Sequence, residues 1–158
     1  MQICLKKLSI LGLIFIISAC GFQLRGDIQA NFESISISGG TSSFNKTLQR
    51  KFRQAGITIE SRSKAEKNVE IIKNKFTKTI LTLTGTGTVS EYQLDYFVTY
   101  RFKSEDGPWN LPITIEASRI YTYDDSDLLA KDEEEKRLVS GMEDQLIKTM
   151  ATQISLSK

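Results

Sequence analysis

The clearest pattern in the chain is the alternation of apolar and polar residues between Val89 and Lys103. In a β-strand, successive side chains point to opposite faces of the sheet, so this alternation predicts a strand with one apolar and one polar face. A sheet of this kind needs cover on its apolar face only, as in antiparallel sheets packed against helices. Phe97 is the one bulky residue on the polar face. The apolar face carries Tyr92, Leu94, Tyr96, Val98, Tyr100 and Phe102.

A second alternating segment follows directly. The turn signal Glu105-Asp106-Gly107-Pro108 separates it from the first. We therefore predict a return strand from Trp109 to Tyr123 and a long hairpin over residues 89–123. Arg119 falls in the apolar phase of the return strand, and we expect it either at the rim of the core or bound to an anion.

Shorter strands are predicted before this hairpin. Ile35 and Ile37 alternate with serines as far as Gly39-Gly40, which indicates a short half-buried strand and a turn. Residues 57–60 can form another short strand. After a polar connector over residues 61–68, a strand rich in β-branched residues is expected to begin at Val69, to bend near residues 74–78 and to stop at Gly85-Thr86-Gly87.

One helix is predicted between the first two short strands. Its apolar residues recur at spacings of four, four and three, with Ser42 and Ser43 as candidate N-caps and Gly56 at the left-handed C′ position. The apolar residues are Phe44, Leu48, Phe52 and Ala55, and the basic residues that cover most of the remaining surface are Lys46, Arg50, Lys51 and Arg53. That basic surface is either an anion-facing surface or the ordinary solvated face of a helix packed on a core.

A second helix is expected at the C-terminal end. Asp124-Asp125-Ser126-Asp127 is a helix-starting cluster, and the acidic run of residues 132–135 suits the exposed N–H groups of a first turn. The buried stripe is predicted to contain Leu138 or Val139, Met142, Leu146, Met150 and Ile154.

The N-terminal stretch has the form of an export signal. Lys6 and Lys7 precede an apolar run over residues 8–17, and small residues follow it up to Cys20. A permanent membrane span needs about 20 apolar residues, so this run is too short for one. Ile-Ser-Ala-Cys also resembles the bacterial lipobox, which implies cleavage after residue 19 and a diacylglycerol on the thiol of Cys20. An ordinary secretory signal that happens to end before Cys20 is the alternative, and Gly21 in place of Asp implies the outer membrane by the same resemblance.

Composition limits the remaining classes of function. Residues 20–158 are the size of a single domain, and they contain one cysteine, which excludes an internal disulfide. Residues 20–80 carry 11 basic and 5 acidic residues, and residues 81–158 carry 8 and 14, so the mature chain is neutral overall. This balance argues against nucleic acid as a partner but leaves room for local anion-binding patches.

The chain also lacks the residues of common catalytic sites. It has no histidine, and we expect its mature cysteine to be acylated, which excludes Ser-His and Cys-His nucleophiles and most zinc sites. Asp124, Asp125 and Asp127 lack the glycine and the closing glutamate of an EF-hand loop. We therefore predict no enzyme, no metal and no cofactor beyond the N-acyl diacylglycerol on Cys20, with a carboxylate-only hydrolase as the remaining catalytic alternative.

The chain resembles the LptE family of LPS-assembly lipoproteins. The resemblance rests on the lipobox, on the start Cys20-Gly21-Phe22-Gln23-Leu24-Arg25-Gly26, and on the order of strands and helices. It also rests on Leu128-Leu129-Ala130-Lys131 leading into Glu134, Met142 and Gln145-Leu146. The resemblance implies an α+β fold in which two helices pack on one face of a mainly antiparallel four-stranded sheet. The implied role is a plug inside the LptD outer-membrane β-barrel, where the two proteins place lipopolysaccharide in the outer leaflet.

The same resemblance implies that the protein binds lipopolysaccharide. Lys131 is the residue that it points to, and Arg101, Lys103 and Arg119 are further candidates from the strand pattern. A lysine at a helix start that is neutralised by Asp127 or Glu135 is the alternative for Lys131. For the whole chain, the alternative is a lipid-anchored auxiliary subunit of another transport system of the cell envelope.

Overall fold

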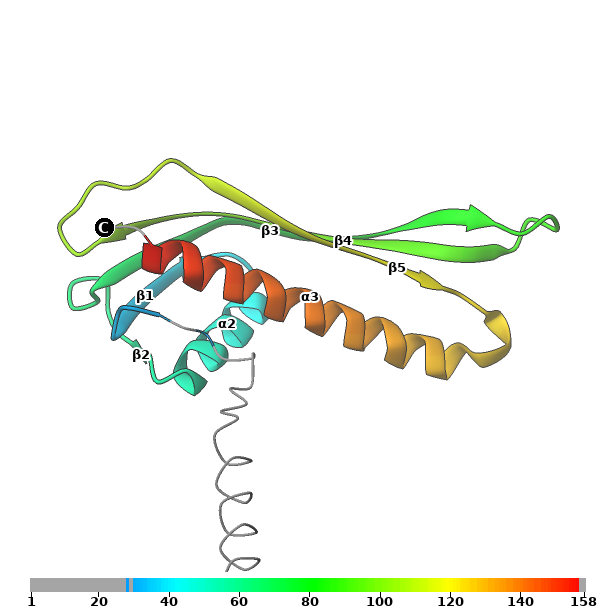
Figure 1. Ribbon diagram of the computed structural model, residues 1–158, viewed down its shortest axis with the longest axis horizontal. Helices are drawn as coiled ribbons and strands as arrows, with labels where there is room; N and C mark the ends of the chain where they lie inside the picture. Colours follow the sequence, from blue (N-terminus) through cyan, green and yellow to red (C-terminus); the bar gives the residue numbers. More distant parts are fainter. Residues whose placement is uncertain (1–27, 29, 157–158) are drawn as a thin grey trace, which may run out of the picture.

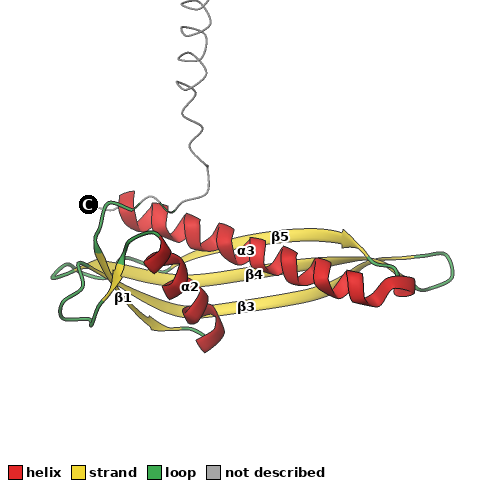
Figure 2. Ribbon diagram, turned by 90° about the horizontal axis from the view of Figure 1, so that it is seen from below, coloured by secondary structure: helices red, strands yellow, loops and turns green. Residues whose placement is uncertain are grey.

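The fold is a five-stranded sheet with two helices on one of its faces (Figures 1 and 2). It is seen in a computed structural model that describes residue 28 and residues 30–156; the expected leader at residues 1–19 and Cys20 lie outside this part. The strands are β1 (Ser34–Gly39), β2 (Thr58–Ile59), β3 (Lys67–Leu83), β4 (Val89–Ser104) and β5 (Ile113–Thr122). The helices are α2 (Ser42–Gln54) and α3 (Leu128–Leu156), with a short 3₁₀ turn, η1 (Asp125–Asp127), directly before α3.

The sheet is antiparallel over β3, β4 and β5, and β1 runs parallel to both of its neighbours in the order β2-β1-β3-β4-β5. The α+β class, the mainly antiparallel sheet and the placement of both helices on one face are confirmed. The predicted number of four strands is wrong by one. The fifth strand, β2, lies within the short strand predicted from the sequence at residues 57–60, and its two residues pair with Ser34 and Ile35 of β1.

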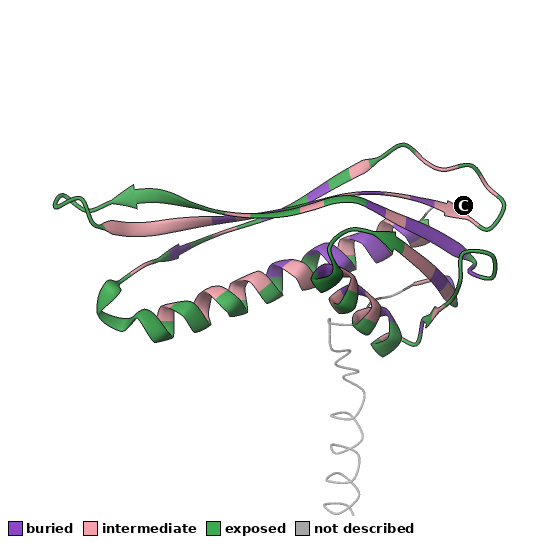
Figure 3. Ribbon diagram, turned by 180° about the vertical axis from the view of Figure 1, so that it is seen from behind, coloured by how far each residue is buried: buried purple, intermediate pink, exposed green. Residues whose placement is uncertain are grey.

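The alternation in β4 gives the sheet one apolar and one polar face, as predicted. Leu94, Val98 and Tyr100 are fully buried under the helices, whereas Phe97 on the other face is 36 % exposed. We call the face under the helices the helix face and the other the open face. Buried residues gather where β1, β2 and α2 lie, which we call the wide end of the molecule (Figure 3). The opposite, mostly exposed end is the distal end, formed by the β3–β4 turn and the start of α3.

Helix α2 buries three of the four residues of the predicted stripe, Phe44, Leu48 and Phe52, completely in the core, while the fourth, Ala55, is the C-cap and is partly buried. Its N-cap is Thr41 and not Ser42 or Ser43. Thr41 has the extended backbone of a cap, and its hydroxyl accepts a hydrogen bond from the N–H of Phe44, while both serines already lie in the first turn. Gly56 has a φ of +82°, which confirms its predicted place just beyond the helix.

Helix α3 is a single helix of 29 residues that crosses the helix face along β4 and β5 (Figure 2). The predicted stripe is confirmed at Met142, Leu146, Met150 and Ile154, which are buried, and Ile147 and Ala151 join them. Polar contacts supplement this packing. The hydroxyl of Tyr96 donates to Glu143 over 3.1 Å, and that of Tyr100 donates to Gln153.

Two strand boundaries differ from the prediction. β3 begins at Lys67 because residues 67–71 already pair with β1, and it has extra residues at Ile72 and Leu81 instead of a bend at 74–78. β5 begins at Ile113 and not at Trp109. Before it, Asn110 exchanges hydrogen bonds with Phe102 through its side-chain oxygen and its own N–H, and Pro112 has no N–H to offer a ladder.

The packing of α3 predicts a large difference between two leucines of the same helix. We expect Leu146→Ala to lower the free energy of unfolding by about 2–5 kcal/mol, because Leu146 is 1 % exposed and its removal leaves a cavity. Leu129→Ala is the control, since Leu129 is 76 % exposed, and we expect a change within about 0.5 kcal/mol. Urea denaturation measures both. Equal effects of the two substitutions would contradict the placement of α3 on the sheet.

Candidate functional site

Near the distal end, Lys78 joins β3 to helix α3. Lys78 lies opposite Leu94 in the β3–β4 register, so its side chain shares the helix face with the core residues of β4. Its ammonium group donates to Glu135 Oε2 over 2.5 Å, and the hydroxyl of Tyr121 donates to the same oxygen over 2.6 Å. One carboxylate of α3 is thereby tied to both β3 and β5.

A group of three tyrosines, Tyr92, Tyr121 and Tyr123, surrounds this lysine and is here called the tyrosine cluster. The Lys78 nitrogen lies 4.1 Å from the ring centre of Tyr92 and within 6 Å of the other two rings. Tyr92 is stacked on Tyr121 and meets Tyr123 edge to face. The rings supply a cation–π environment in addition to the ion pair, so the lysine is held in place by the sheet as well as by the helix.

The titration of these groups reflects the close contacts. Burial acts to raise the pKa of Glu135, but the hydrogen bonds from Lys78 and Tyr121 outweigh it and hold that pKa below its usual value. Burial and the hydrogen bond to Glu135 raise the pKa of Tyr121 to about 12. Burial opposes the charge of Lys78, yet the contacts with Glu135 and Tyr121 raise its pKa above the ordinary range. At neutral pH the pair is therefore fully ionised.

Lys131 lies in the first turn of α3, one turn before Glu135. Its ammonium group pairs with Glu134 at 2.9 Å, and its side chain is 21 % exposed. The backbone N–H of Ser126 and that residue's hydroxyl hold the pKa of Asp124 below its usual value, and the charge of Lys131 adds to this effect. Lys131 is thus paired, as the alternative interpretation expected, but its partner is Glu134 and not Asp127 or Glu135.

Arg119 lies on the helix face of β5, in register with Leu94. Its guanidinium donates to the carbonyl of Ser118 and, over 2.6 Å, to the side-chain oxygen of Gln145 on α3. Of the two placements expected for Arg119, the structure shows the one at the rim of the core, with a neutral partner.

Arg101 and Lys103 lie on the open face, near the wide end, and so are on the other side of the sheet from Lys131 and Arg119. Arg101 pairs with Glu70 at 2.6 Å, and its guanidinium lies 4.8 Å from the ring centre of Trp109. Lys103 donates to the carbonyl of Glu105. The structure therefore does not gather the four predicted residues into one site.

The sequence analysis missed Lys78, Glu135 and the tyrosine cluster as a unit. The sequence did contain an indication that Lys78 has a partner. Phe76, Lys78 and Ile80 occupy alternate positions of β3, so Lys78 lies in the apolar phase of the strand. A charged residue in such a row requires a partner above the sheet. The partner could not be identified from the sequence, since Glu135 is 57 residues away.

The distal end combines cations with exposed apolar side chains. Leu128 and Leu129, which precede Lys131 on α3, are 55 % and 76 % exposed, and Ile80 and Leu83 of β3 are each 57 % exposed. Phosphate groups pair with lysine, and exposed leucines suit acyl chains, so this end is equipped to bind an anionic amphiphile. Within the part of the chain that the structure describes, no group of His, Cys, Asp and Glu could hold a metal ion. No helix of that part is long and apolar enough to cross a membrane.

The contacts of Glu135 predict an acid-sensitive contribution to stability. A carboxylate whose pKa is lowered by folding stabilises the native state above its unfolded pKa of about 4.3, and this gain is lost as the pH falls through the folded value. We expect Glu135→Gln to cost about 1–2 kcal/mol at pH 7 and progressively less below about pH 4. Thermal unfolding across this pH range measures the difference. Glu133→Gln, which breaks an exposed pair on the same helix, is the control with little effect, and a pH-independent loss in Glu135→Gln would refute the assignment.

Comparison with solved structures places the fold among bacterial lipoproteins. Lipoprotein B of Nitrosomonas europaea is 27 % identical with a TM-score of 0.70, covering 85 % of this chain and 90 % of that one. Rare lipoprotein B of Shewanella oneidensis is 26 % identical with a TM-score of 0.62, covering 76 % and 95 %. A minor lipoprotein of Acinetobacter baumannii, 20 % identical with a TM-score of 0.62 over 80 % and 93 %, shares the fold.

The search of curated proteins gave no match. The LptE family, described as lipopolysaccharide-assembly, matches residues 32–154, which span the structure from two residues before β1 almost to the end of α3. This range contains all five strands, α2, and all of α3 except its last two residues. The chain therefore belongs to the LptE family of lipopolysaccharide-assembly proteins.

Proposed function

We propose that this protein is an outer-membrane lipoprotein that acts with the LptD β-barrel, as its plug and assembly factor, in the insertion of lipopolysaccharide. The family match over residues 32–154 carries this proposal. An N-acyl diacylglycerol on Cys20, after removal of residues 1–19, anchors the domain of residues 20–158 on the periplasmic side of the membrane. The role is non-catalytic, and the protein binds lipopolysaccharide and its barrel partner.

The distal end supports the lipopolysaccharide-binding part of the proposal. Lipid A presents phosphates next to acyl chains, and Lys131 lies beside the exposed Leu128 and Leu129. Its ion pair with Glu134 joins neighbouring turns of a helix at a partly exposed position, so it contributes little and can be exchanged for a phosphate. Arg119, Arg101 and Lys103 have partners of their own and are secondary candidates.

We expect Lys131→Glu to weaken binding of purified protein to lipopolysaccharide by about tenfold or more, the loss of one hydrogen bond between charged groups. Lys136→Glu is the matched control, because Lys136 lies five residues further on the same helix and is 71 % exposed. It should change the dissociation constant less than about twofold. Glu134→Gln should lower the dissociation constant, since loss of the Glu134 carboxylate frees Lys131. Unchanged binding in a folded Lys131→Glu variant would remove Lys131 from the site.

A further inference from the structure

Helix α2 has a surface made of cations alone. Lys46, Arg50 and Arg53 follow one another at spacings of four and three, on the side opposite the buried stripe, and all three are exposed. The helix contains no acidic residue. This row of three residues is called the basic face of α2 below.

The basic face lacks counterions within the part of the chain that the structure describes. Lys51, on the flank of the same helix, pairs with Asp144 of α3 at 2.9 Å, and lysines of α3 pair with neighbouring glutamates. Among the described residues, Lys46, Arg50 and Arg53 have no hydrogen-bond or ion-pair partner through their side chains. Three aligned cations without counterions favour an extended anionic partner outside the chain.

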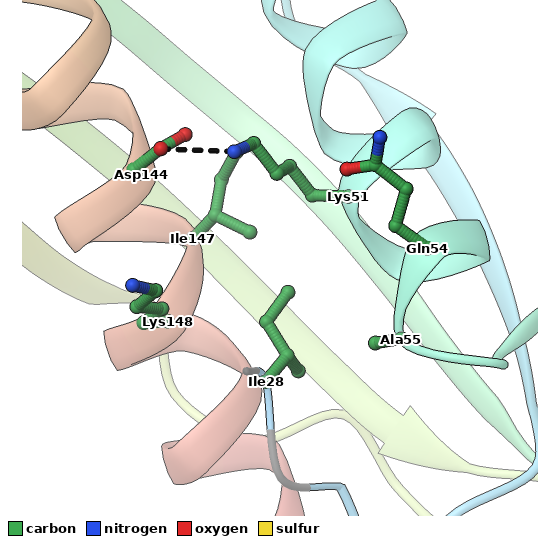
Figure 4. A pocket seen from close by; sticks show the side chains of 7 residues that line it. All are labelled: Ile28, Lys51, Gln54, Ala55, Asp144, Ile147 and Lys148. Atoms are coloured by element: carbon green, nitrogen blue, oxygen red, sulfur yellow. Dashed lines mark hydrogen bonds and ion pairs between the residues drawn. The ribbon is translucent and has the colours of Figure 1, made fainter. Parts of the chain in front are cut away.

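The position of Ile28 indicates where such a partner lies. Ile28 packs between α2 and α3, where it lines a cavity of about 150 Å³ with Ala55, Ile147 and Lys148 (Figure 4). The described chain therefore begins at the groove between the two helices, on the helix side of the sheet. Cys20 precedes Ile28 by eight residues, and eight residues span at most about 28 Å even when fully extended.

We propose that the basic face of α2 docks on the anionic glycerophospholipids of the leaflet in which the lipid anchor is embedded. This proposal rests on the proposed lipid attachment at Cys20, which holds the groove and its helices within one short tether of the headgroups. Cations at a membrane surface are attracted over roughly one Debye length, about 8 Å at physiological ionic strength, so the tether brings them into range. The docked helix orients the domain, with the open face of the sheet turned away from this leaflet.

The test uses the mature lipidated protein on vesicles of phosphatidylcholine, with or without phosphatidylglycerol. A fluorophore is attached through S43C, on the exposed start of α2, or through S118C, on the open face of β5, and a spin label on the lipid headgroup serves as quencher. We expect stronger quenching at S43C than at S118C on vesicles that contain phosphatidylglycerol. The difference should disappear on pure phosphatidylcholine and at 1 M salt, where the Debye length is about 3 Å.

Two charge variants test which cations are responsible. Each lysine or arginine at an anionic surface strengthens binding about fivefold, so K46Q/R50Q/R53Q should lower the ratio of docked to undocked protein on the order of 100-fold. K73Q/K75Q/K103Q removes the same charge from the open face and should leave the quenching at S43C unchanged. Equal quenching at the two labels, or equal losses in the two variants, would overturn the proposal. If the fluorophore at S43C became shielded only when a barrel protein was present, the proposal would also be overturned.

Flotation separates this proposal from the proposed function. Protein that floats with pure phosphatidylcholine vesicles carries the anchor, whether or not α2 docks on the membrane. If it floats only with vesicles that contain phosphatidylglycerol, in a salt-sensitive manner, the lipid attachment is wrong and docking through α2 is supported. If it floats with both kinds of vesicle but S43C is not quenched, the anchor is present and docking is refuted.

Discussion

The burial of one face of β4 beneath helix α3 is the contact on which the rest of the structure depends. β4 presents an unbroken apolar row, and α3 is the element long enough to cover most of it. Burial of a large aliphatic side chain is worth about 1.5–3 kcal/mol, so the row and the stripe together provide the main stabilisation of the domain. α2 completes the cover over β1 and the adjoining part of β3.

Three tyrosines fix where α3 lies along the sheet. Tyr100, Tyr96 and Tyr121 each place a ring in the core and donate their hydroxyl to a side chain of α3, at Gln153, Glu143 and Glu135. Apolar packing tolerates sliding better than hydrogen bonds do, because it is not directional. The Tyr100 contact lies towards the wide end and the Tyr121 contact towards the distal end, so directional polar contacts hold α3 on the sheet near both of its ends. The distal end keeps its leucines exposed and Lys131 partly exposed, which a fully packed end could not do.

The local elements were predictable from the sequence because their periods are unambiguous. The two-residue period of β4, the stripe of α2 and the position of Gly56 lead directly to the observed structure. Contacts between distant segments were not predictable. Lys78 pairs with Glu135, which lies 57 residues further along the chain, and Trp109 lies outside the strand, against Arg62 and Arg101. Lys131 lies in the first turn of α3 and pairs with a carboxylate, as the alternative interpretation expected, but the identity of its partner depended on side-chain geometry that spacing does not determine.

We propose that this LptE-family domain works inside a barrel, with its anchored end at the phospholipid surface. The most direct test is to isolate the tagged, lipidated protein in mild detergent and to identify whatever accompanies it by mass spectrometry. We expect an outer-membrane β-barrel protein in equimolar amount. Inner-membrane transport components in its place, or no partner at all, would contradict the proposed role as a plug. The relationship to the LptE family would then extend to the fold alone.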